Sequence, residues 1–386
     1  MPEFHSRFEK IDRRVPIDEH NCAVQFDVTK CKNCTLCRRA CADTQTVLDY
    51  YSLSSTGDMP ICVHCGQCSS ACPFGAIVEV NDVDKVKAAL KDPEKIVIFQ
   101  TAPAVRVGLG EAFGMDPGTF VEGKMVAALR TLGADYVFDT DFGADLTIME
   151  EATELLHRLQ SEEIPIPQFT SCCPAWVEFA ETFYPDLLQH LSSTKSPISI
   201  LSPVIKTYFA QQKNIDPKKI VNVCVAPCTA KKAEIRRPEL SAAGLFWDEP
   251  EIRDTDICIT TRELAQWIQD ENIDFANLED GQFDKAFGEA SGGGRISWKR
   301  LSARLTTCSR VVRHRRTSFP LNRSAACRAS RRQRSSSATS SFTSLPSAAW
   351  ATPAPSSTTS SRTTPLKTTP SSKSWPAQAA ASAAVA

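Results

Sequence analysis

Two kinds of segment are missing from this 386-residue sequence. No apolar run approaches the roughly 20 residues of a membrane-spanning helix, so we do not expect a membrane protein. The N-terminal stretch MPEFHSRFEKIDRR carries too many charges for a secretory signal peptide. We therefore expect a cytoplasmic protein, and a periplasmic location stays open only through a partner subunit's signal sequence.

Acidic side chains are missing from residues 295–386. This segment holds 16 of the 44 Lys and Arg residues and none of the 45 Asp and Glu residues. Residues 1–294 are left with 28 basic and 45 acidic side chains, a net charge of about −17. The sequence therefore divides near Gly294 into an acidic body and a basic tail.

Cysteine, by contrast, is abundant, with 16 residues. In a chain that is not secreted, thiols stay reduced, so the expected role of so many cysteines is metal ligation. Eight of them form two copies of the pattern C-x-x-C-x-x-C-x-x-x-C. The first copy is Cys31, Cys34, Cys37 and Cys41, and the second is Cys62, Cys65, Cys68 and Cys72.

This doubled spacing is typical of two 4Fe-4S clusters. Three thiolates on one tight loop reach three corners of an iron-sulfur cube, and the fourth cysteine of each run completes the other cube. We assign one cluster to Cys31, Cys34, Cys37 and Cys72, and the other to Cys62, Cys65, Cys68 and Cys41. A pair of zinc sites is the alternative, although zinc sites rarely use eight cysteines in this spacing. Cys22 lies outside the pattern and is expected to be an ordinary thiol.

The middle of the chain alternates strands and helices. Residues 95–113 predict a strand, a loop and a helix, and residues 124–159 predict helix, strand and helix. Residues 219–228 and 254–269 each predict a strand that leads into a loop or helix, the second with a capping box from Thr260 to Glu263. This alternation predicts an α/β domain with a mainly parallel sheet, in which ligands collect at loops beyond the strand ends.

Two loops of this domain carry cysteines. Residues 169–176 (FTSCCPAW) supply Cys172 and Cys173, and residues 225–234 (VAPCTAKKAE) supply Cys228. Taken alone, the adjacent pair fits an inert core position equally well. Downstream of eight cluster-type cysteines, the two loops together indicate a further metal site.

Residues 22–294 resemble the iron-only (FeFe) hydrogenases, and residues 23–85 resemble the bacterial two-cluster ferredoxins. The resemblance implies a ferredoxin-like α+β segment with two 4Fe-4S clusters, followed by an α/β catalytic domain. It also implies an H-cluster, which is a 4Fe-4S cube joined through one cysteine to a di-iron centre with CO, cyanide and dithiolate ligands. The implied reaction is the reversible reduction of protons to dihydrogen.

Matching the motifs gives roles to individual residues. Cys173 and Cys228 would ligate the H-cluster cube, and Cys172 would be the last proton carrier. Lys231 would donate a hydrogen bond to a cyanide ligand, as a cation should to an anionic acceptor in a dry pocket. The residues that would line the di-iron pocket are Ala102 and Pro103.

The resemblance also implies a path for protons. Thiol, carboxylate and hydroxyl groups at hydrogen-bond spacing can pass protons one at a time to a buried site. The residues that match the family's path from Cys172 to the surface are Glu151, Ser192 and Glu154. Glu234 matches a further carboxylate near the site. Without the resemblance, each glutamate would be interpreted as an ordinary solvated helix position.

The family's third cysteine motif, Ala-Cys-Pro-Gly-Gly-Cys, does not occur in the sequence. Cys308 and Cys327 are 19 residues apart and have no glycine neighbours. The cube would therefore have two of its four protein thiolates. We do not expect the H-cluster to assemble on the chain as the sequence stands.

The tail allows three interpretations. Its Ser, Thr, Ala, Pro and Arg residues, without acidic partners, predict disorder, and the clusters VVRHRR and RRQR are compatible with a nucleic-acid-binding arm. The third interpretation is a shifted reading frame. The codons for PSSKSWPAQAAASAAVA permit, in a shifted frame, Phe-Ile-Glu-Val-Met-Ala-Cys-Pro-Gly-Gly-Cys-Ile followed by four Gly.

A second stretch supports the same frame. The codons for ISWKRLSARLTT permit Met-Glu-Ala-Ala-Leu-Arg-Thr-Ala-Tyr, and Trp298 with Lys299 forces the Glu. The family has such a helix after its glycine-rich loop, which Phe287 to Gly294 match. Our hypothesis is a single net frameshift close to Gly294, which the nucleotide sequence through this junction would test.

The favoured interpretation is a hydrogenase that receives electrons through two 4Fe-4S clusters. The alternative is a catalytically inactive iron-sulfur electron-transfer protein. Expected partners are ferredoxin or another small electron carrier, maturation proteins and a small hydrogenase subunit, with no nucleic acid and no membrane. The expected domains are an N-terminal extension (1–22), the two-cluster ferredoxin domain (23–85), an incomplete H-cluster domain (93–294) and an out-of-frame tail (295–386).

Overall fold

The computed structural model of the chain describes residues 13–160 and 164–284. The predictions made for the tail at 295–386 and for the first 12 residues lie outside this range. None of the helices within it is long and apolar enough to cross a membrane.

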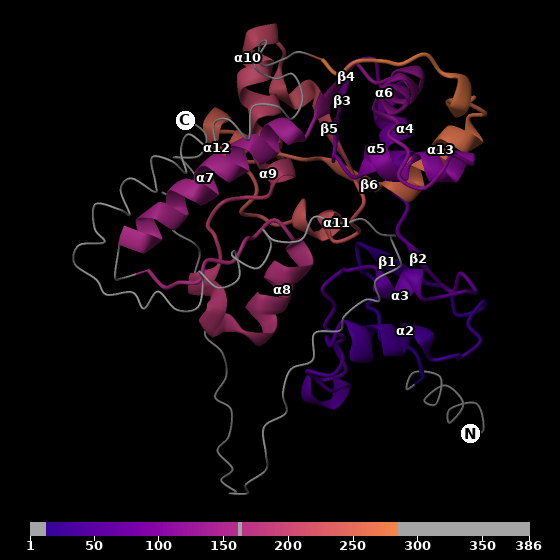
Figure 1. Cartoon of the computed structure of the whole chain (residues 1–386), viewed down its shortest axis with the longest axis vertical. Coiled ribbons are helices and arrows are strands. Elements are labelled where there is room, and N and C mark those ends of the chain that lie inside the picture. The colour runs from indigo at the N-terminus through magenta and orange to yellow at the C-terminus, as the bar shows by residue number, and fades with distance from the viewer. Residues whose placement is uncertain (1–12, 161–163, 285–386) are drawn as a thin grey trace, which may run out of the picture. The chain divides into compact units, whose positions relative to one another are not determined.

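A four-stranded parallel sheet forms the centre of the α/β domain (Figure 1). Its strands, in spatial order, are β4 (Tyr136–Asp139), β3 (Ile96–Thr101), β5 (Ile220–Ala226) and β6 (Ile257–Thr260). All three strand pairs are parallel, and Phe99 is level with Val137 on one side and Val223 on the other. The predicted α/β layout with a parallel sheet is confirmed.

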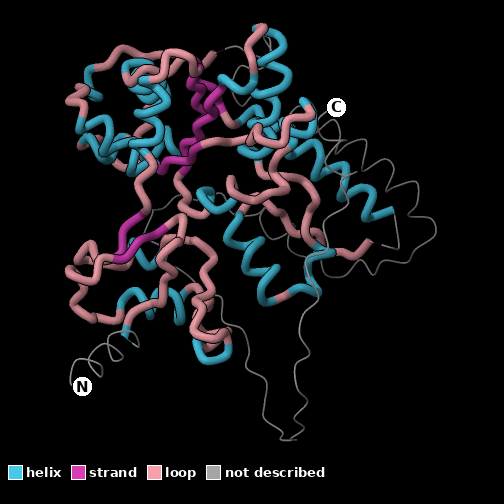
Figure 2. The backbone as a smooth tube through the Cα atoms, turned by 180° about the vertical axis from the view of Figure 1, so that it is seen from behind, coloured by secondary structure: helices cyan, strands magenta, loops and turns pink. Residues whose placement is uncertain are grey.

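Both faces of the sheet are covered by helices, as the cyan and magenta segments of Figure 2 show. Val97 and Phe99 of β3 belong to a core shared with α4 (Val83–Lys91), α6 (Glu122–Thr131) and α13 (Thr261–Asp270). Ile98, between them, belongs to a second core with α9 (Pro197–Val204), the π-helix Ile205–Phe209 and α10 (Ala210–Lys213). Successive strand residues point to opposite faces, so a buried parallel strand is apolar on both.

Five further helices lie beyond the strand ends or beside the sheet. The capping box predicted at Thr260 and Glu263 is present at the start of α13, and it ends β6 where that helix begins. The helices that carry or flank candidate site residues are α5 (Val105–Gly108), α7 (Asp141–Gln160), α8 (Pro174–Phe183), α11 (Lys231–Glu234) and α12 (Ala242–Trp247).

The N-terminal segment has a small sheet and core of its own. Strands β1 (Val24–Phe26) and β2 (Ile77–Glu79) pair antiparallel, and the short helices α2 (Leu36–Arg39) and α3 (Gln67–Ser70) lie between them in the chain. Val15, Val24 and Ile77 are buried against the side chains of Cys37 and Cys68. The core of this segment is therefore built partly from the cysteines, and its ferredoxin-like fold stays a prediction.

Buried ion pairs fix the point where the chain passes from this segment into the α/β domain. The Lys232 ammonium is 1% exposed and lies 2.8 Å from an Asp82 carboxylate oxygen and 2.9 Å from one of Glu263. The backbone N–H of Asp82 also donates to Glu263 at 2.7 Å. Since a buried cation is stable only with such partners, this triad fixes the start of α4 against α11 and α13.

Candidate iron-sulfur and catalytic site

The two cysteine loops of the N-terminal segment share one backbone conformation. Each has left-handed residues at two matching positions, which are Asn33 and Thr35 in the first loop and His64 and Gly66 in the second. This turn points the N–H of Asn33 at the sulfur of Cys31 (3.5 Å) and that of His64 at the sulfur of Cys62 (3.3 Å). Hydrogen bonds from the backbone orient ligand side chains around a metal centre, so both loops hold their first cysteine in the same way.

Four cysteines from both runs line one space in this segment. Cys31, Cys34 and Cys37 of the first loop lie around it together with Cys72 of the second, among the apolar side chains of Phe26 and Ile77. Among the described residues, no three His, Cys, Asp or Glu side chains converge at the distances of a single metal ion. The set around this space is the one that the spacing assigns to one cluster, and ligation stays a prediction.

The other four cysteines influence one another's ionisation. Burial raises the pKa of Cys68 to about 12, and the nearby sulfurs of Cys62, Cys65 and Cys41 add to the rise. Burial likewise raises the pKa of Cys41 to about 11, with contributions from Cys62 and Cys65. Grouped buried thiolates require a bound cation, which displaces the thiol protons. The donor set therefore fits an iron-sulfur cluster.

Cys228 lies next to this second group. Burial raises the pKa of Cys228, the sulfur of Cys173 raises it further, and the Lys231 ammonium opposes the rise. Burial raises the pKa of Cys65, and the sulfur of Cys228 contributes to this rise. The loop after β5 thus brings one predicted H-cluster ligand between Cys173 and an accessory-cluster ligand.

Cys172 and Cys173 are exposed at the start of α8. Cys173 occupies the N-cap position, followed by Pro174. The Cys173 side chain makes no capping hydrogen bond to the helix, so the sulfur is free to ligate a metal. The local fold thus suits ligation by Cys173.

Lys231 and Glu234 form a buried pair on α11, with side chains 10% and 8% exposed. The Lys231 ammonium donates to a Glu234 carboxylate oxygen at 2.5 Å and to the carbonyl oxygen of Cys172 at 3.0 Å. The other Glu234 oxygen accepts hydrogen bonds from the hydroxyls of Ser199, at 2.6 Å, and Ser196. The Lys231 ammonium is therefore held against the backbone of the loop that carries Cys172 and Cys173.

Ala102 and Pro103 follow β3 at the same edge of the sheet. The N–H of Ala102 donates to the carbonyl oxygen of Val225 at 2.9 Å, so the loop after β3 runs beside the loop that carries Cys228. The parallel sheet brings the two loops together, as expected for adjacent strands that end at one edge.

The predicted relay residues come from two segments that lie side by side. Ser192 N–H donates to the carbonyl oxygen of Phe169 at 2.7 Å, and the Ser171 hydroxyl donates to that of Thr194 at 2.5 Å. The loop before Cys172 therefore runs along the loop of Ser192. The Ser192 hydroxyl donates to a Glu154 carboxylate oxygen at 2.6 Å.

Glu151 lies one turn before Glu154 on α7. Burial raises its pKa, and the Glu154 carboxylate raises it further. One Glu151 oxygen is buried and has no hydrogen-bond partner among the described residues. Within this part of the chain, no hydrogen bond joins the Cys172 thiol to Glu151 or Ser192. The structure therefore connects Ser192 to Glu154, while the rest of the relay stays a prediction.

The sequence analysis missed Arg158, which lies one turn after Glu154. Its guanidinium donates to a Glu154 oxygen at 2.7 Å and to the carbonyl oxygens of Pro165, Gln189 and Leu191 at 3.0, 2.8 and 2.7 Å. An acidic residue four positions before an arginine on a helix is a known pairing pattern. The four-residue spacing of Glu154 and Arg158 could therefore have predicted this ion pair from the sequence.

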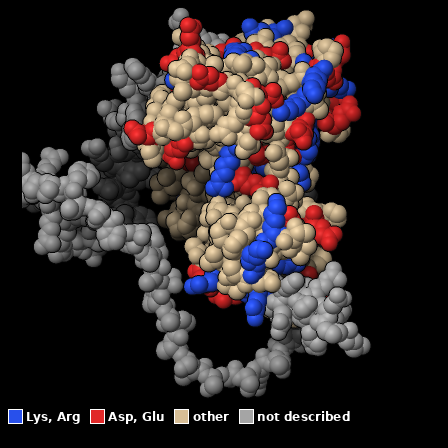
Figure 3. All heavy atoms as spheres, turned by 90° about the vertical axis from the view of Figure 1, so that its right-hand side faces the viewer, with Lys and Arg blue, Asp and Glu red and all other residues tan. Residues whose placement is uncertain are grey.

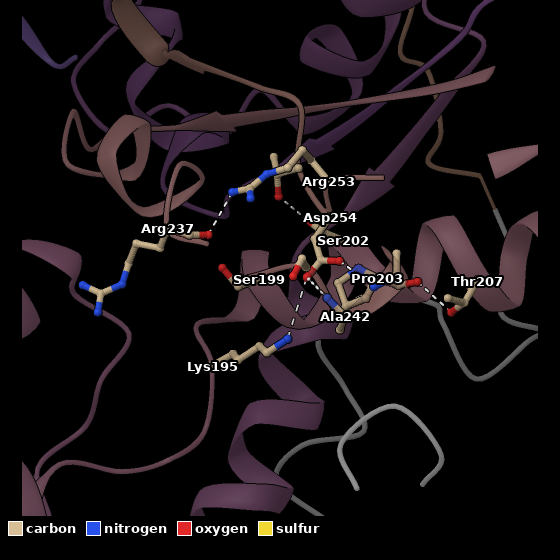
Figure 4. Close-up of polar contacts among 12 residues, drawn as sticks. Lys195, Ser199, Ser202, Pro203, Thr207, Arg237, Ala242, Arg253 and Asp254 are labelled. Atoms are coloured by element: carbon tan, nitrogen blue, oxygen red, sulfur yellow. Dashed lines mark hydrogen bonds and ion pairs between the residues drawn. The ribbon is translucent and has the colours of Figure 1, made fainter. Parts of the chain in front are cut away.

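The far end of the Ser192 loop is also fixed. Lys195 lies 3.7 Å from the carboxylate of Asp254, and Asp254 accepts hydrogen bonds from the N–H groups of Ala242 and Ala243 at 3.0 and 2.7 Å (Figure 4). Asp254 is 1% exposed and accepts hydrogen bonds from the first N–H groups of α12, which have no partner within the helix. The loop between Ser192 and Lys195 is thus held at both ends.

Comparison with known proteins gives the family. Residues 95–337 match the iron only hydrogenase large subunit, C-terminal domain, and residues 58–78 match a 4Fe-4S binding domain. The first match covers more than half of the chain, so the chain belongs to the iron-only hydrogenase large-subunit family. An iron-sulfur segment thus precedes a hydrogenase domain.

Individual relatives agree with this assignment. Iron hydrogenase 1 from Clostridium pasteurianum is 46% identical over 297 residues, which are 74% of this chain and 50% of that protein. The solved structure of a variant of apo [FeFe]-hydrogenase HydA1 from Chlamydomonas reinhardtii is 43% identical, with a TM-score of 0.52 over 56% of this chain and 54% of that one. Cytosolic iron-sulfur assembly component 3 from Bos taurus is 32% identical over 60% of this chain and 49% of that protein. The chain spans about half the length of the curated relatives it matches.

Proposed function

We propose that the protein catalyses the reversible reduction of protons to dihydrogen, with electrons supplied through two 4Fe-4S clusters to an H-cluster. The observation that carries the proposal is that Cys173, Cys228 and Lys231 lie near one another beyond the strand ends. The Ser192 loop, which bonds to Glu154, runs along the segment that leads to Cys172. The higher identity to iron hydrogenase 1 than to the iron-sulfur assembly component (46% against 32%) favours hydrogenase chemistry over assembly.

The residues that would hold the H-cluster are Cys173 and Cys228. When bound, this group supplies the redox chemistry of hydrogen. Lys231 keeps its ammonium in a dry position where hydrogen bonds to an anion are strong, and Glu234 balances its charge. Ala102 and Pro103 would shape the adjacent pocket, because their loop runs beside Cys228.

Protons would reach the site through Ser192 and Glu154. Glu154 is held by Arg158 on one oxygen, while its second oxygen accepts from Ser192. Burial and the Glu154 carboxylate raise the pKa of Glu151, which is the direction that suits a carboxyl acting as a proton carrier. Cys172 would complete the path, since its thiol is exposed and its carbonyl oxygen accepts a hydrogen bond from Lys231.

Electrons would enter at the cavity of Cys31, Cys34, Cys37 and Cys72. Arg13 and Lys32 are exposed at this cavity and have no ion-pair partner among the described residues. Figure 3 shows lysine and arginine side chains over the N-terminal segment. Although residues 1–294 are acidic as a whole, this local charge favours an acidic small electron carrier, such as a ferredoxin.

A second candidate function is a non-catalytic iron-sulfur electron-transfer protein. The observation that favours it is the lack of a third cysteine motif, since Cys308 and Cys327 are the only cysteines after Cys258. The N-terminal clusters would still form. In that case the purified protein would contain about eight irons and would neither evolve nor take up hydrogen.

Hydrogen evolution from reduced methyl viologen tests the first candidate. The chain is matured anaerobically in two versions, one as the sequence stands and one with residues 295–386 replaced by the translation of the shifted frame. We expect evolution from the second version alone. Absence of evolution from both, with about eight irons bound in each, would leave the electron-transfer function.

A further inference from the structure

One hydrogen bond joins the loop that carries Cys62, Cys65 and Cys68 to the loop that carries Cys228. The Thr229 hydroxyl donates to the carbonyl oxygen of His64 at 2.8 Å. Thr229 follows Cys228 directly, and His64 lies between Cys62 and Cys65. Thr229 is 6% exposed, so water does not readily replace its hydroxyl as the donor to this carbonyl.

Glycine at position 66 is what permits this contact. A Cβ atom at Gly66 would lie 2.5 Å from the Thr229 hydroxyl oxygen, closer than real Cβ atoms approach other atoms, and 3.0 Å from its methyl carbon. The φ angle of Gly66 is +72°, a left-handed conformation that glycine adopts without strain. The matching residue of the first loop, Thr35, has a similar φ, so the close approach depends on the missing side chain at residue 66.

The turn at residues 64–66 has a second contact with the catalytic domain. His64 is fixed a second time, because its Nδ1 lies 2.7 Å from a Glu178 carboxylate oxygen on α8. The turn at residues 64–66 is thus held against both the Cys228 loop and the helix that begins after Cys173.

We propose that Thr229 is a positioning residue that holds the Cys62–Cys68 loop against the Cys228 loop. In doing so it sets the distance that electrons cross between the accessory cluster and the catalytic centre. The electron-transfer part of this inference rests on the proposed function. The clamp, by which we mean the Thr229–His64 hydrogen bond together with the close approach of Thr229 to Gly66, is a property of the folded chain.

The test measures amide hydrogen exchange of residues 62–68 and 226–231 in the full chain, with and without reconstituted iron-sulfur clusters. Thr229→Val keeps the side-chain shape but removes the donor. We expect exchange in both segments to become about two- to tenfold faster, as the loss of one neutral hydrogen bond implies. Thr229→Ser retains the hydroxyl and should restore slow exchange.

Gly66→Ala tests the close approach separately. It should accelerate exchange in both segments more than Gly57→Ala does. Gly57 also has a positive φ (+63°) but no atom within 4 Å of an added Cβ, so it controls for backbone strain alone. Combining Gly66→Ala with Thr229→Ala should recover part of the loss, because the second change removes the atoms that clash.

Two outcomes would overturn the clamp. One is exchange in Thr229→Val that matches the unmodified chain, and the other is an effect of Gly66→Ala no larger than that of Gly57→Ala with no recovery in the double variant. The iron-free samples keep this result separate from the proposed function. If the exchange pattern appears but the chain binds no iron, the clamp stands and the electron route fails.

Discussion

The hydroxyl of Ser192 donates a 2.6 Å hydrogen bond to the carboxylate of Glu154, which lies 38 residues earlier on α7. The same carboxylate is held by Arg158 through its other oxygen. Ser192 is 2% exposed, so this contact is shielded from bulk water. It is the one step of the predicted proton path that the described residues complete.

Ser192→Ala should slow hydrogen evolution by roughly 100-fold or more, the range expected for loss of a positioned proton-transfer group. The measurement uses the matured chain in which the translation of the shifted frame replaces residues 295–386. Ser193→Ala is the matched control. Ser193 is exposed and contacts Glu154 only through its backbone N–H, which the substitution keeps. Equal rates for the two variants, with unchanged thermal unfolding, would remove Ser192 from the path.

Cys72→Ala should reduce the bound iron by about four of roughly eight atoms, because Cys72 is assigned to the cluster held by Cys31, Cys34 and Cys37. Cys41→Ala should cost a similar number from the second cluster, and the electron paramagnetic resonance spectra of the two reduced variants should differ. Cys22→Ala, which removes a buried thiol outside the pattern, should keep all of the iron. Identical spectra for the Cys72 and Cys41 variants would contradict the crossed assignment.

Lys232→Met should lower the free energy of unfolding by about 3–5 kcal/mol, because it removes the buried cation shared by the carboxylates of Asp82 and Glu263. Lys85 is the natural control. It lies 2.6 Å from the other Asp82 oxygen, but its side chain is 60% exposed, so Lys85→Met should cost less than about 1 kcal/mol. Urea titration of iron-free protein measures both, and similar losses would show that burial does not strengthen the Lys232 pairing.

Asp82 should also govern part of the acid sensitivity. Burial alone would raise the pKa of Asp82, but hydrogen bonds from Lys232 and Lys85 outweigh it and lower the pKa below its usual range. A depressed carboxyl pKa contributes stability that is present above the unfolded-state value, about 4, and is lost as pH falls through the folded value. Asp82→Asn should therefore flatten the decline in stability below about pH 5. An unchanged slope would exclude this contribution.

Local patterns predicted much of the α/β domain. Thr260 and Glu263 could be assigned to a capping box because both partners lie within one helical turn. The second role of Glu263, as a partner of Lys232 and Asp82, depends on residues 31 and 181 positions away. No spacing rule encodes that contact.

The sequence likewise predicted only part of the candidate site. The doubled cysteine pattern grouped Cys31, Cys34 and Cys37 with Cys72, and these four thiols line one space in the structure. The pattern could do so because three of the cysteines lie on one loop, and the fourth cysteine of each run is expected to serve the other cluster. The contact between Thr229 and His64 could not be predicted, since it depends on how the N-terminal segment packs against the loop after β5. Gly66 looks like an ordinary turn glycine until Thr229 is seen beside it.

The central claim is that Cys173, Cys228 and Lys231 form half of an H-cluster site that a third cysteine motif completes. The infrared spectrum of anaerobically matured protein tests it most directly, because CO and cyanide ligands absorb where protein does not. The account predicts these bands for the version with the shifted-frame C-terminus and none for the chain as the sequence stands. Bands in neither version, despite fully occupied accessory clusters, would contradict it.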